Sequence, residues 1–155
     1  MHRIWKALTV LSPRWASVLV VCGALLLSRT ATATPLLLIS PASATVLAGD
    51  AVSLDVTISG VTDLYAFEFD IAFDSSLLRA DDILEGAFLA TGGSTFYIPG
   101  VIDNTLGIVS FTANSLIGAI PGVSGDGILA VLAFTALGPG TSPVAISNVV
   151  LLDSL

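Results

Sequence analysis

The segment from Leu64 to Phe73 constrains the fold more than any other part of this chain. Its sequence, LYAFEFDIAF, alternates with a period of two, which is typical of a strand with one buried face. The predicted inward face carries Tyr65, Phe67, Phe69, Ile71 and Phe73, and the outward face carries Ala66, Glu68, Asp70 and Ala72. Four of the nine aromatic residues that follow residue 33 lie in the inward row. This row therefore predicts the floor of a hydrophobic core whose opposite wall comes from a second sheet.

The first 33 residues have the pattern of a secretory signal peptide. Basic residues precede an apolar run at 16–27, and the small residues Ala31-Thr32-Ala33 offer a cleavage site. A transmembrane anchor is the alternative, but only 14 residues separate Arg14 from Arg29, whereas a membrane span needs about 20. Lipoprotein processing at Cys22 would want a small residue where Val21 stands. We expect cleavage near Ala33 and export to the cell surface or the medium, with the periplasm as a further destination.

Cleavage at that site would leave one domain, residues 34–155, and would narrow its chemistry. The single His, Cys and Met and both Trp all lie in the leader. The remainder has Arg79 as its only basic residue against twelve carboxylates, a formal net charge of −11. Nucleic acids and anionic membranes require a basic patch, so we expect neither as a partner. Catalysis by a His-activated serine or cysteine and zinc sites of imidazole or thiolate are excluded by composition.

The rest of the chain predicts short strands separated by turn residues. Glycine-containing segments at 60–63 and 124–127 are expected to be turns, and 128–137 is apolar on both faces. That last pattern suits a central strand covered on both sides, or a strand at a partner interface. No segment has a helical period longer than about a turn. The predicted strands lie at 35–47 (an edge strand interrupted by a turn), 51–59, 64–73, 77–83, 95–98, 106–113, 128–137 and 144–152. The expected fold is an all-β sandwich of eight or nine antiparallel strands.

Four motifs in this order resemble the cohesin domain of bacterial secreted proteins. They are Gly49-Asp50 before an alternating strand, LYAFEFDIAFD followed by SSLL, the GDG motif at 125–127 running into ILAVLAF, and ISNVVLLDS at 146–154. The resemblance covers roughly residues 44–154. It implies a jelly-roll sandwich related to some carbohydrate-binding modules. It also implies docking of dockerin-bearing proteins in extracellular polysaccharide breakdown or cell-surface assembly.

Carboxylates are the only groups left for catalysis or metal binding. Asp81, Asp82 and Glu85 could supply a glycosidase acid and base, but a sugar cleft usually also needs aromatic platforms, and tryptophan is lacking beyond residue 33. We interpret them as solvated loop charges. Structural calcium would need oxygen ligands that converge, and no EF-hand spacing is present. The calcium candidates are Asp70, Asp74, Asp81, Asp82, Asp103, Asn104 and Asp126. We therefore expect no catalytic residue, cofactor or resident metal.

Three binding functions remain open. The leading hypothesis is a non-catalytic module that binds a dockerin-like module or another surface protein. The second is a carbohydrate-binding module that uses Tyr65, Tyr97 or a polar strand face on a polysaccharide. The third is a subunit that assembles with itself through the apolar segment 128–137. The outward row of the 64–73 strand is either a recognition surface or an ordinary solvated face, Tyr97 is either a contact or a core residue, and Arg79 is expected to pair with Asp81 or Asp82.

Overall fold

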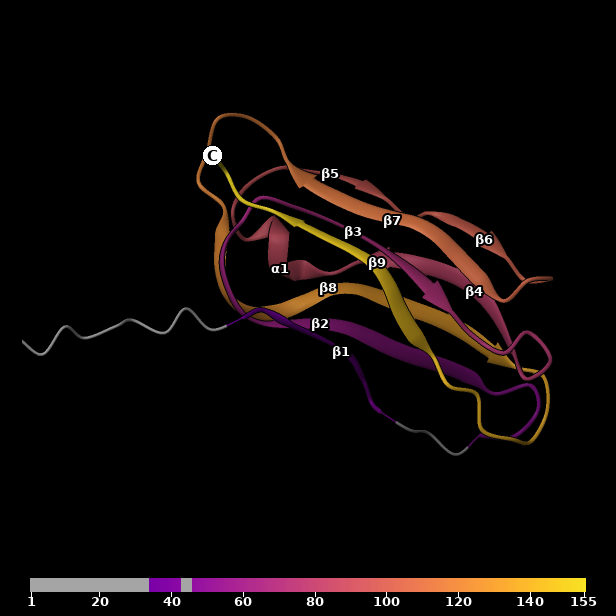
Figure 1. The fold of residues 1–155 in the computed structure, drawn as a ribbon. Helices are drawn as coiled ribbons and strands as arrows, with labels where there is room; N and C mark the ends of the chain where they lie inside the picture. The colour runs from indigo at the N-terminus through magenta and orange to yellow at the C-terminus, as the bar shows by residue number, and fades with distance from the viewer. Residues whose placement is uncertain (1–33, 43–45) are drawn as a thin grey trace, which may run out of the picture. The chain divides into compact units, whose positions relative to one another are not determined.

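The computed structural model describes residues 34–42 and 46–155, which form two antiparallel sheets packed face to face (Figure 1). One sheet has the strand order β1-β2-β8-β4, and the other has the order β5-β7-β3-β9, with β6 also paired to β7. The strands are β1 Leu36–Ser40, β2 Ala51–Leu64, β3 Ala66–Ala72, β4 Leu78–Glu85, β5 Thr95–Ile98, β6 Val101–Asp103, β7 Ile108–Leu116, β8 Val123–Ala136 and β9 Ala145–Leu152. The predicted sandwich is confirmed. The predicted signal peptide lies outside the described residues.

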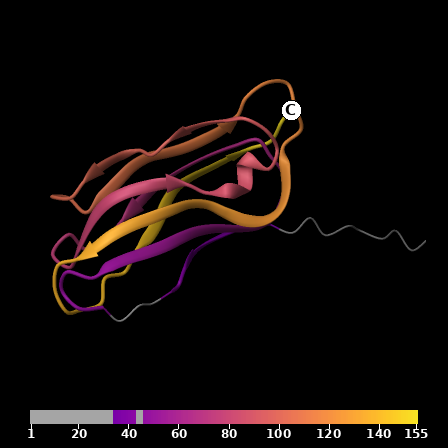
Figure 2. The same ribbon diagram turned by 180° about the vertical axis from the view of Figure 1, so that it is seen from behind.

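The described region contains one short helix, α1, at Ala87–Ala90. Both ribbon views place α1 at the end of the sandwich where the C-terminus lies (Figures 1 and 2). Phe88 and Leu89 of this helix are buried, so α1 closes that end of the core. Among the described residues, no helix has the length and apolar character needed to cross a bilayer.

The inward face of β3 forms the floor of the core, as predicted. Phe67, Phe69 and Ile71 are buried, and the rings of Phe67 and Phe69 stack with their centroids 5.7 Å apart. Phe73 meets Phe134 of β8 edge to face, with centroids 5.2 Å apart. Because Phe134 belongs to the opposite sheet, this contact joins the two layers and carries the energetic benefit of an aromatic pair in addition to its buried area.

Two predicted turns are wrong, because both segments lie inside long strands. Residues 60–63 continue β2, and residues 124–127 continue β8, which pairs with β2 along its length. Register shifts in β2 after Ile58 and Val61 absorb the unusual backbone of Gly60 and Asp63, which have φ of 68° and 58°. Asp126 accepts a hydrogen bond from the Gly60 amide at 2.7 Å. Turn-forming residues here form bulges in a long antiparallel strand pair rather than chain reversals.

β8 occupies a central position, as its apolar sequence predicted. It lies between β2 and β4, so both of its edges already have hydrogen-bonded partners. Its outward residues Val131, Ala133 and Thr135 are half-buried by their neighbours, and no third layer of described residues covers them. The strand is therefore covered on one face, and it offers no free edge for pairing with another molecule.

Gly86 lies where the chain passes closest to the backbone of β8. Its amide donates to the Leu129 carbonyl at 2.9 Å, and a side chain added at this position would collide with the Ile128 carbonyl oxygen. A collision with backbone cannot be relieved by rotating a side chain. The absence of a β-carbon at residue 86 therefore allows α1 to seal the core.

We predict that Gly86→Ala lowers the free energy of unfolding by about 1–3 kcal/mol, the usual cost of overpacking. The control is Gly138→Ala, since a β-carbon at position 138 meets no atom within 4 Å. That variant should stay within about 0.5 kcal/mol of the parent. Urea titration of both variants measures the difference. Equal stability of the two variants would contradict the close-approach interpretation.

Asp63 ties together three separate parts of the sandwich. Its carboxylate accepts hydrogen bonds from the Ser154 hydroxyl at 2.8 Å and from the Gly122 amide at 2.7 Å. Both bonds stabilise the charged carboxylate and so hold the pKa of Asp63 below its usual value, and the bond from Ser154 has the larger effect. The end of β2 is thereby joined to the segment that precedes β8 and to the segment that follows β9.

We predict that Asp63→Asn destabilises the fold at neutral pH and that the difference from the parent shrinks in acid. Because the folded pKa is lowered, the carboxylate stabilises the fold above its unfolded pKa of about 3.9 and loses that contribution as pH falls through the folded value. Urea unfolding at pH 7 and pH 3 measures the effect. Asp55→Asn serves as control, because in the described part of the chain the Asp55 carboxylate accepts no hydrogen bond. A difference independent of pH would contradict the role of the Asp63 charge.

Candidate functional site

The carboxylates considered for glycosidase chemistry are occupied by structural interactions. Asp81 accepts a hydrogen bond from the Thr135 hydroxyl at 2.6 Å and pairs at 2.7 Å with Arg79, as expected for the only arginine among the described residues. The hydrogen bond from Thr135 lowers the pKa of Asp81, and the Arg79 guanidinium lowers it further. A catalytic acid needs a raised pKa instead. Glu85 accepts from Thr95 and from buried Asn114, at 2.5 and 2.8 Å. These groups hold β4 to its neighbours.

The structure does not bring the calcium candidates together. Asp74 accepts bonds from Ser76, and Asp103 accepts the amides of Thr105 and Leu106, so both carboxylates stabilise local turns. The side-chain amide of Asn104 accepts from the Ala80 amide through its oxygen and donates to the Ala80 carbonyl through its nitrogen. Within residues 34–42 and 46–155, no three acidic, histidine or cysteine side chains gather closely enough to hold a metal ion.

The two tyrosines considered for sugar binding serve the fold. Tyr97 is half-buried, and its hydroxyl crosses to the opposite sheet to donate to the Ile83 carbonyl at 3.2 Å. Burial is the main reason that the pKa of Tyr97 lies above its usual value, and the negative charge of Glu85 raises it further. The Tyr65 hydroxyl donates to the Gly118 carbonyl at 2.5 Å. Both phenol rings are half-buried, whereas a sugar platform presents an exposed aromatic face.

The exposed aromatic residues are instead Phe96 and Phe111, at 63% and 49% exposure. Neither was singled out by sequence reasoning. Phe96 precedes Tyr97 in a strand of four residues, so alternation could not tell which of the two adjacent aromatic residues faces the core. Both phenylalanines belong to the five-stranded sheet, on β5 and β7, and they mark its outward face as the surface that needs explanation.

Strand register places two rows of side chains across this outward face. The first row is Phe96, Ser115, Ala66 and Leu152, and the second is Ile98, Ala113, Glu68 and Val150. In both rows the large apolar residues stand on the outer strands β5 and β9, while the inner strands β7 and β3 carry alanine, serine and one glutamate. Large walls with a low floor make a trough, and a hollow of about 180 Å³ lies there.

The trough has the width of an α-helix. Three inter-strand spacings separate its walls on β5 and β9, which at about 4.8 Å each gives roughly 14 Å. An α-helix with its side chains is about 10–12 Å across. Alanine and serine on the floor allow close approach of a helix backbone, and the walls provide apolar contact on both sides. The half-buried Glu68 is the one charged group in the two rows.

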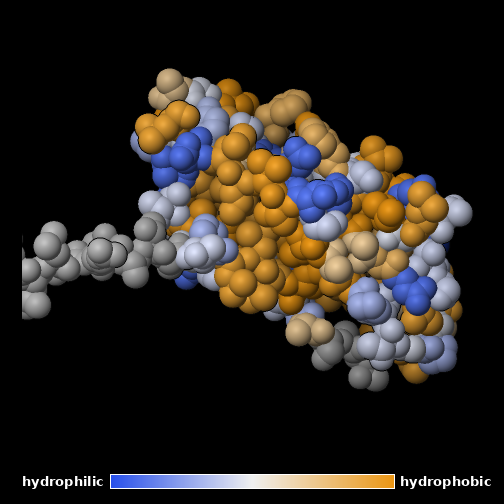
Figure 3. Space-filling view, viewed as in Figure 1, coloured by the Kyte–Doolittle hydropathy of each residue, from blue (hydrophilic) through white to orange (hydrophobic). Residues whose placement is uncertain are grey.

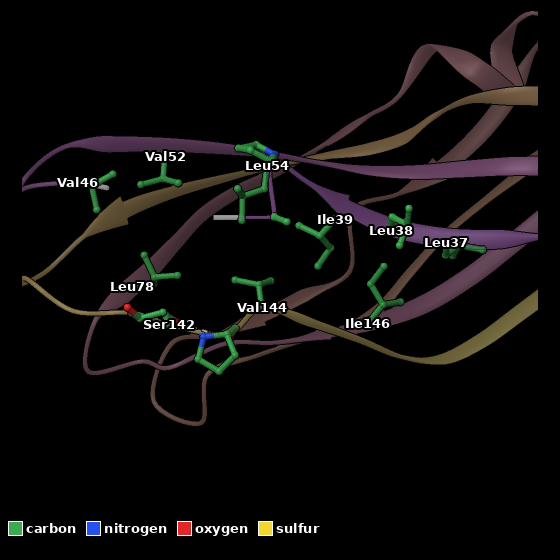
Figure 4. A pocket seen from close by; sticks show the side chains of 14 residues that line it. Leu37, Leu38, Ile39, Val46, Val52, Leu54, Leu78, Ser142, Val144 and Ile146 are labelled. Carbon is green, nitrogen blue, oxygen red and sulfur yellow. Dashed lines mark hydrogen bonds between the residues drawn. The ribbon is translucent and has the colours of Figure 1, made fainter. Parts of the chain in front are cut away.

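A second cavity opens between the edge strands β1 and β9 and has a volume of about 640 Å³ (Figure 4). Leu37 and Ile39 of β1 point into it from one side and Val144 and Ile146 from the other (Figure 4). The space-filling view shows a broad apolar area over β9 and β1, bordered by hydrophilic groups (Figure 3). The cavity lining contains no titratable side chain, so it offers packing surface rather than chemistry.

The fold and the arrangement of its sheets match those of known cohesins. The family model for the cohesin domain matches residues 39–155. A comparison with curated proteins found no significant match. Solved structures do match, and the identities of those described next are all below 20%, so these likenesses concern the fold.

Three solved structures illustrate the likeness. A chain in a type II cohesin–X-dockerin complex from Acetivibrio cellulolyticus matches with a TM-score of 0.62 at 17% identity, covering 76% of this chain and 85% of its own. A type I cohesin–dockerin complex from Clostridium thermocellum gives 0.61 at 19% identity, with coverage of 79% and 88%. A non-cellulosomal cohesin from the archaeon Archaeoglobus fulgidus gives 0.60 at 17% identity, with coverage of 79% and 80%. The chain thus has the jelly-roll fold that the resemblance implied, and it belongs to the cohesin domain family.

Proposed function

We propose that this chain is an exported, non-catalytic docking module that binds a dockerin-like module of another protein in the trough on its five-stranded sheet. The observation that carries the proposal is the shape of that face. Apolar walls on β5 and β9 enclose a floor of small residues at the spacing of one helix. Dockerins are the partners named in two of the matching structures, and this supports the choice of partner.

The composition of the trough indicates the chemistry of the partner. The apolar walls require an amphipathic helix with its apolar stripe turned inward. Glu68 on the floor and the strongly acidic composition of residues 34–155 favour lysine or arginine beside that stripe. We therefore expect a helix with both apolar and basic residues on its docking face.

The biological setting follows from the family rather than from the trough. Several matching cohesins come from cellulosomes, and one is described as non-cellulosomal. We propose that this module acts outside the cell, in polysaccharide breakdown or cell-surface assembly, after removal of the leader at 1–33. The inward role of Tyr97 and the paired edges of β8 give no support to the carbohydrate-binding and self-assembly alternatives.

Direct binding tests the proposal. Purified dockerin modules encoded in the same genome would be titrated into the 34–155 protein in a calorimeter. We expect at least one to bind with a dissociation constant of micromolar or tighter. If none binds at tens of micromolar, the docking function is wrong, although the fold assignment stands.

We predict that Ala113→Arg weakens that binding at least tenfold, which corresponds to about 1.4 kcal/mol. The arginine would fill the floor of the trough and place a positive charge against a basic helix. The matched control is Ala133→Arg, because Ala133 is also half-buried and faces outward on an inner strand, but of the other sheet. It should bind like the parent. Equal effects of the two substitutions on affinity would place the partner elsewhere.

A further inference from the structure

Two bulges lie side by side on the strands that flank β3. On β7, Ser110 and Phe111 together face the single residue Asp70, because the register with β3 shifts between Phe69 and Ile71. On β9, Asn148 and Val149 together face Phe69, because the register shifts between Glu68 and Asp70. The two bulges thus lie opposite adjacent residues of β3, which makes them a local feature of the sheet rather than a consequence of its general twist.

Each bulge contains a non-glycine residue in the left-handed region. Phe111 has φ of 60° and Asn148 has φ of 51°. Asparagine tolerates this conformation, but for a bulky residue such as phenylalanine it is an outlier. Glycine would adopt it without strain. Phe111 is also 49% exposed, so its ring gains only part of the benefit that burial would give.

Asp70 holds both bulges through its two carboxylate oxygens. Its Oδ1 accepts the Phe111 amide at 2.8 Å, and its Oδ2 accepts the Asn148 side-chain amide at 2.6 Å. Both bonds hold the pKa of Asp70 below its usual value, the bond from Phe111 with the larger effect, so the carboxylate stays charged. In the described region the one ion pair joins Arg79 to Asp81, so no cation neutralises Asp70.

Asp70 and Phe111 continue the trough. On the outward face, Phe111 lies two residues before Ala113 on β7, and Asp70 lies two residues after Glu68 on β3. Because these strands are antiparallel, Phe111 and Asp70 lie side by side and form a third row next to the two described above. Three rows spaced by two strand residues cover about 13 Å, the length of roughly nine helical residues. A helix lying along the trough would therefore meet this third row at its end.

We propose that Phe111 is a partner-contacting residue at the end of the trough and that Asp70 is the positioning residue that presents it. The inference rests on the proposed docking function and adds a specific anchor to it. A strained backbone and a half-exposed ring both act against stability at position 111, so selection for folding alone does not account for phenylalanine there. A basic residue of the partner helix suits the position, because its aliphatic stem can lie on the ring while its charge faces Asp70.

Substitutions at position 111 distinguish the role of the ring in partner binding from the effect of the backbone conformation on stability. Phe111→Ala and Phe111→Gly both remove the ring, but only glycine also relieves the backbone. We expect both variants to bind the dockerin module that the parent binds at least tenfold more weakly. We also expect the glycine variant to melt at a higher temperature than the alanine variant and no lower than the parent. Unchanged affinity, or equal melting temperatures of the two variants, would overturn the proposal.

Two substitutions at position 70 test the role of Asp70. Asp70→Ala removes the charge and both acceptors, so the bonds to Phe111 and Asn148 are lost. Asp70→Asn removes the charge but keeps an oxygen that can accept the Phe111 amide and an amide that can pair with a flipped Asn148 side chain. We therefore expect Asp70→Ala to weaken binding several-fold more than Asp70→Asn. Equal weakening by the two variants would mean that Asp70 acts through its charge alone and would overturn its positioning role.

The two levels of the proposal fail in different ways. If the parent binds no dockerin module, the docking function fails and the anchor role of Phe111 fails with it. If the parent binds, and Ala113→Arg disrupts binding while both Phe111 variants bind normally, the docking function stands and only the anchor is wrong.

Discussion

The structure depends on the burial of one phenylalanine-rich strand face against the opposite sheet. Phe69 is completely buried, and the edge-to-face contact of Phe73 with Phe134 connects β3 to β8. Residues 34–155 contain no cysteine, so this packing is not reinforced by disulfides. Once the inward row of β3 is fixed, its outward row is fixed too, since successive side chains alternate between faces. The proposed docking surface is therefore on the reverse side of the same strand that organises the core.

The positions of most strands could be predicted, from alternation at 64–73 and from short runs of β-forming residues between turn residues elsewhere. The segment 64–73 matched β3, 95–98 matched β5, and the central position of 128–137 was confirmed. The two wrong predictions, the turns at 60–63 and 124–127, both rested on glycine and aspartate residues. In the long β2–β8 pair these residues form bulges, because the neighbouring strand supplies the hydrogen bonds that a turn would otherwise need, as Asp126 does for Gly60. β6 was also not predicted, since three residues are too few to show a period.

The candidate site could be predicted only in part. The outward row of β3 was recognised as either a recognition surface or a solvated face, but the trough depends on cross-strand neighbours that come from distant parts of the sequence. Phe96, Ala66 and Leu152 share one row only because of strand order and register. The two adjacent aromatic residues in the short strand β5 also left open which of them faces outward. The position of Phe111 depends on a bulge, which reverses the face that simple alternation assigns.

The carboxylate of Asp63 connects the stability of the fold to the shape of the trough. One wall of the trough is formed by β9, an edge strand with a hydrogen-bonded partner on one side only. Just beyond that strand, Ser154 is fastened to Asp63 of the opposite sheet. Protonation at a pH below the lowered pKa of Asp63 removes the charge that strengthens this hydrogen bond. Strong acid would therefore loosen the end of β9 and, with it, one wall of the trough.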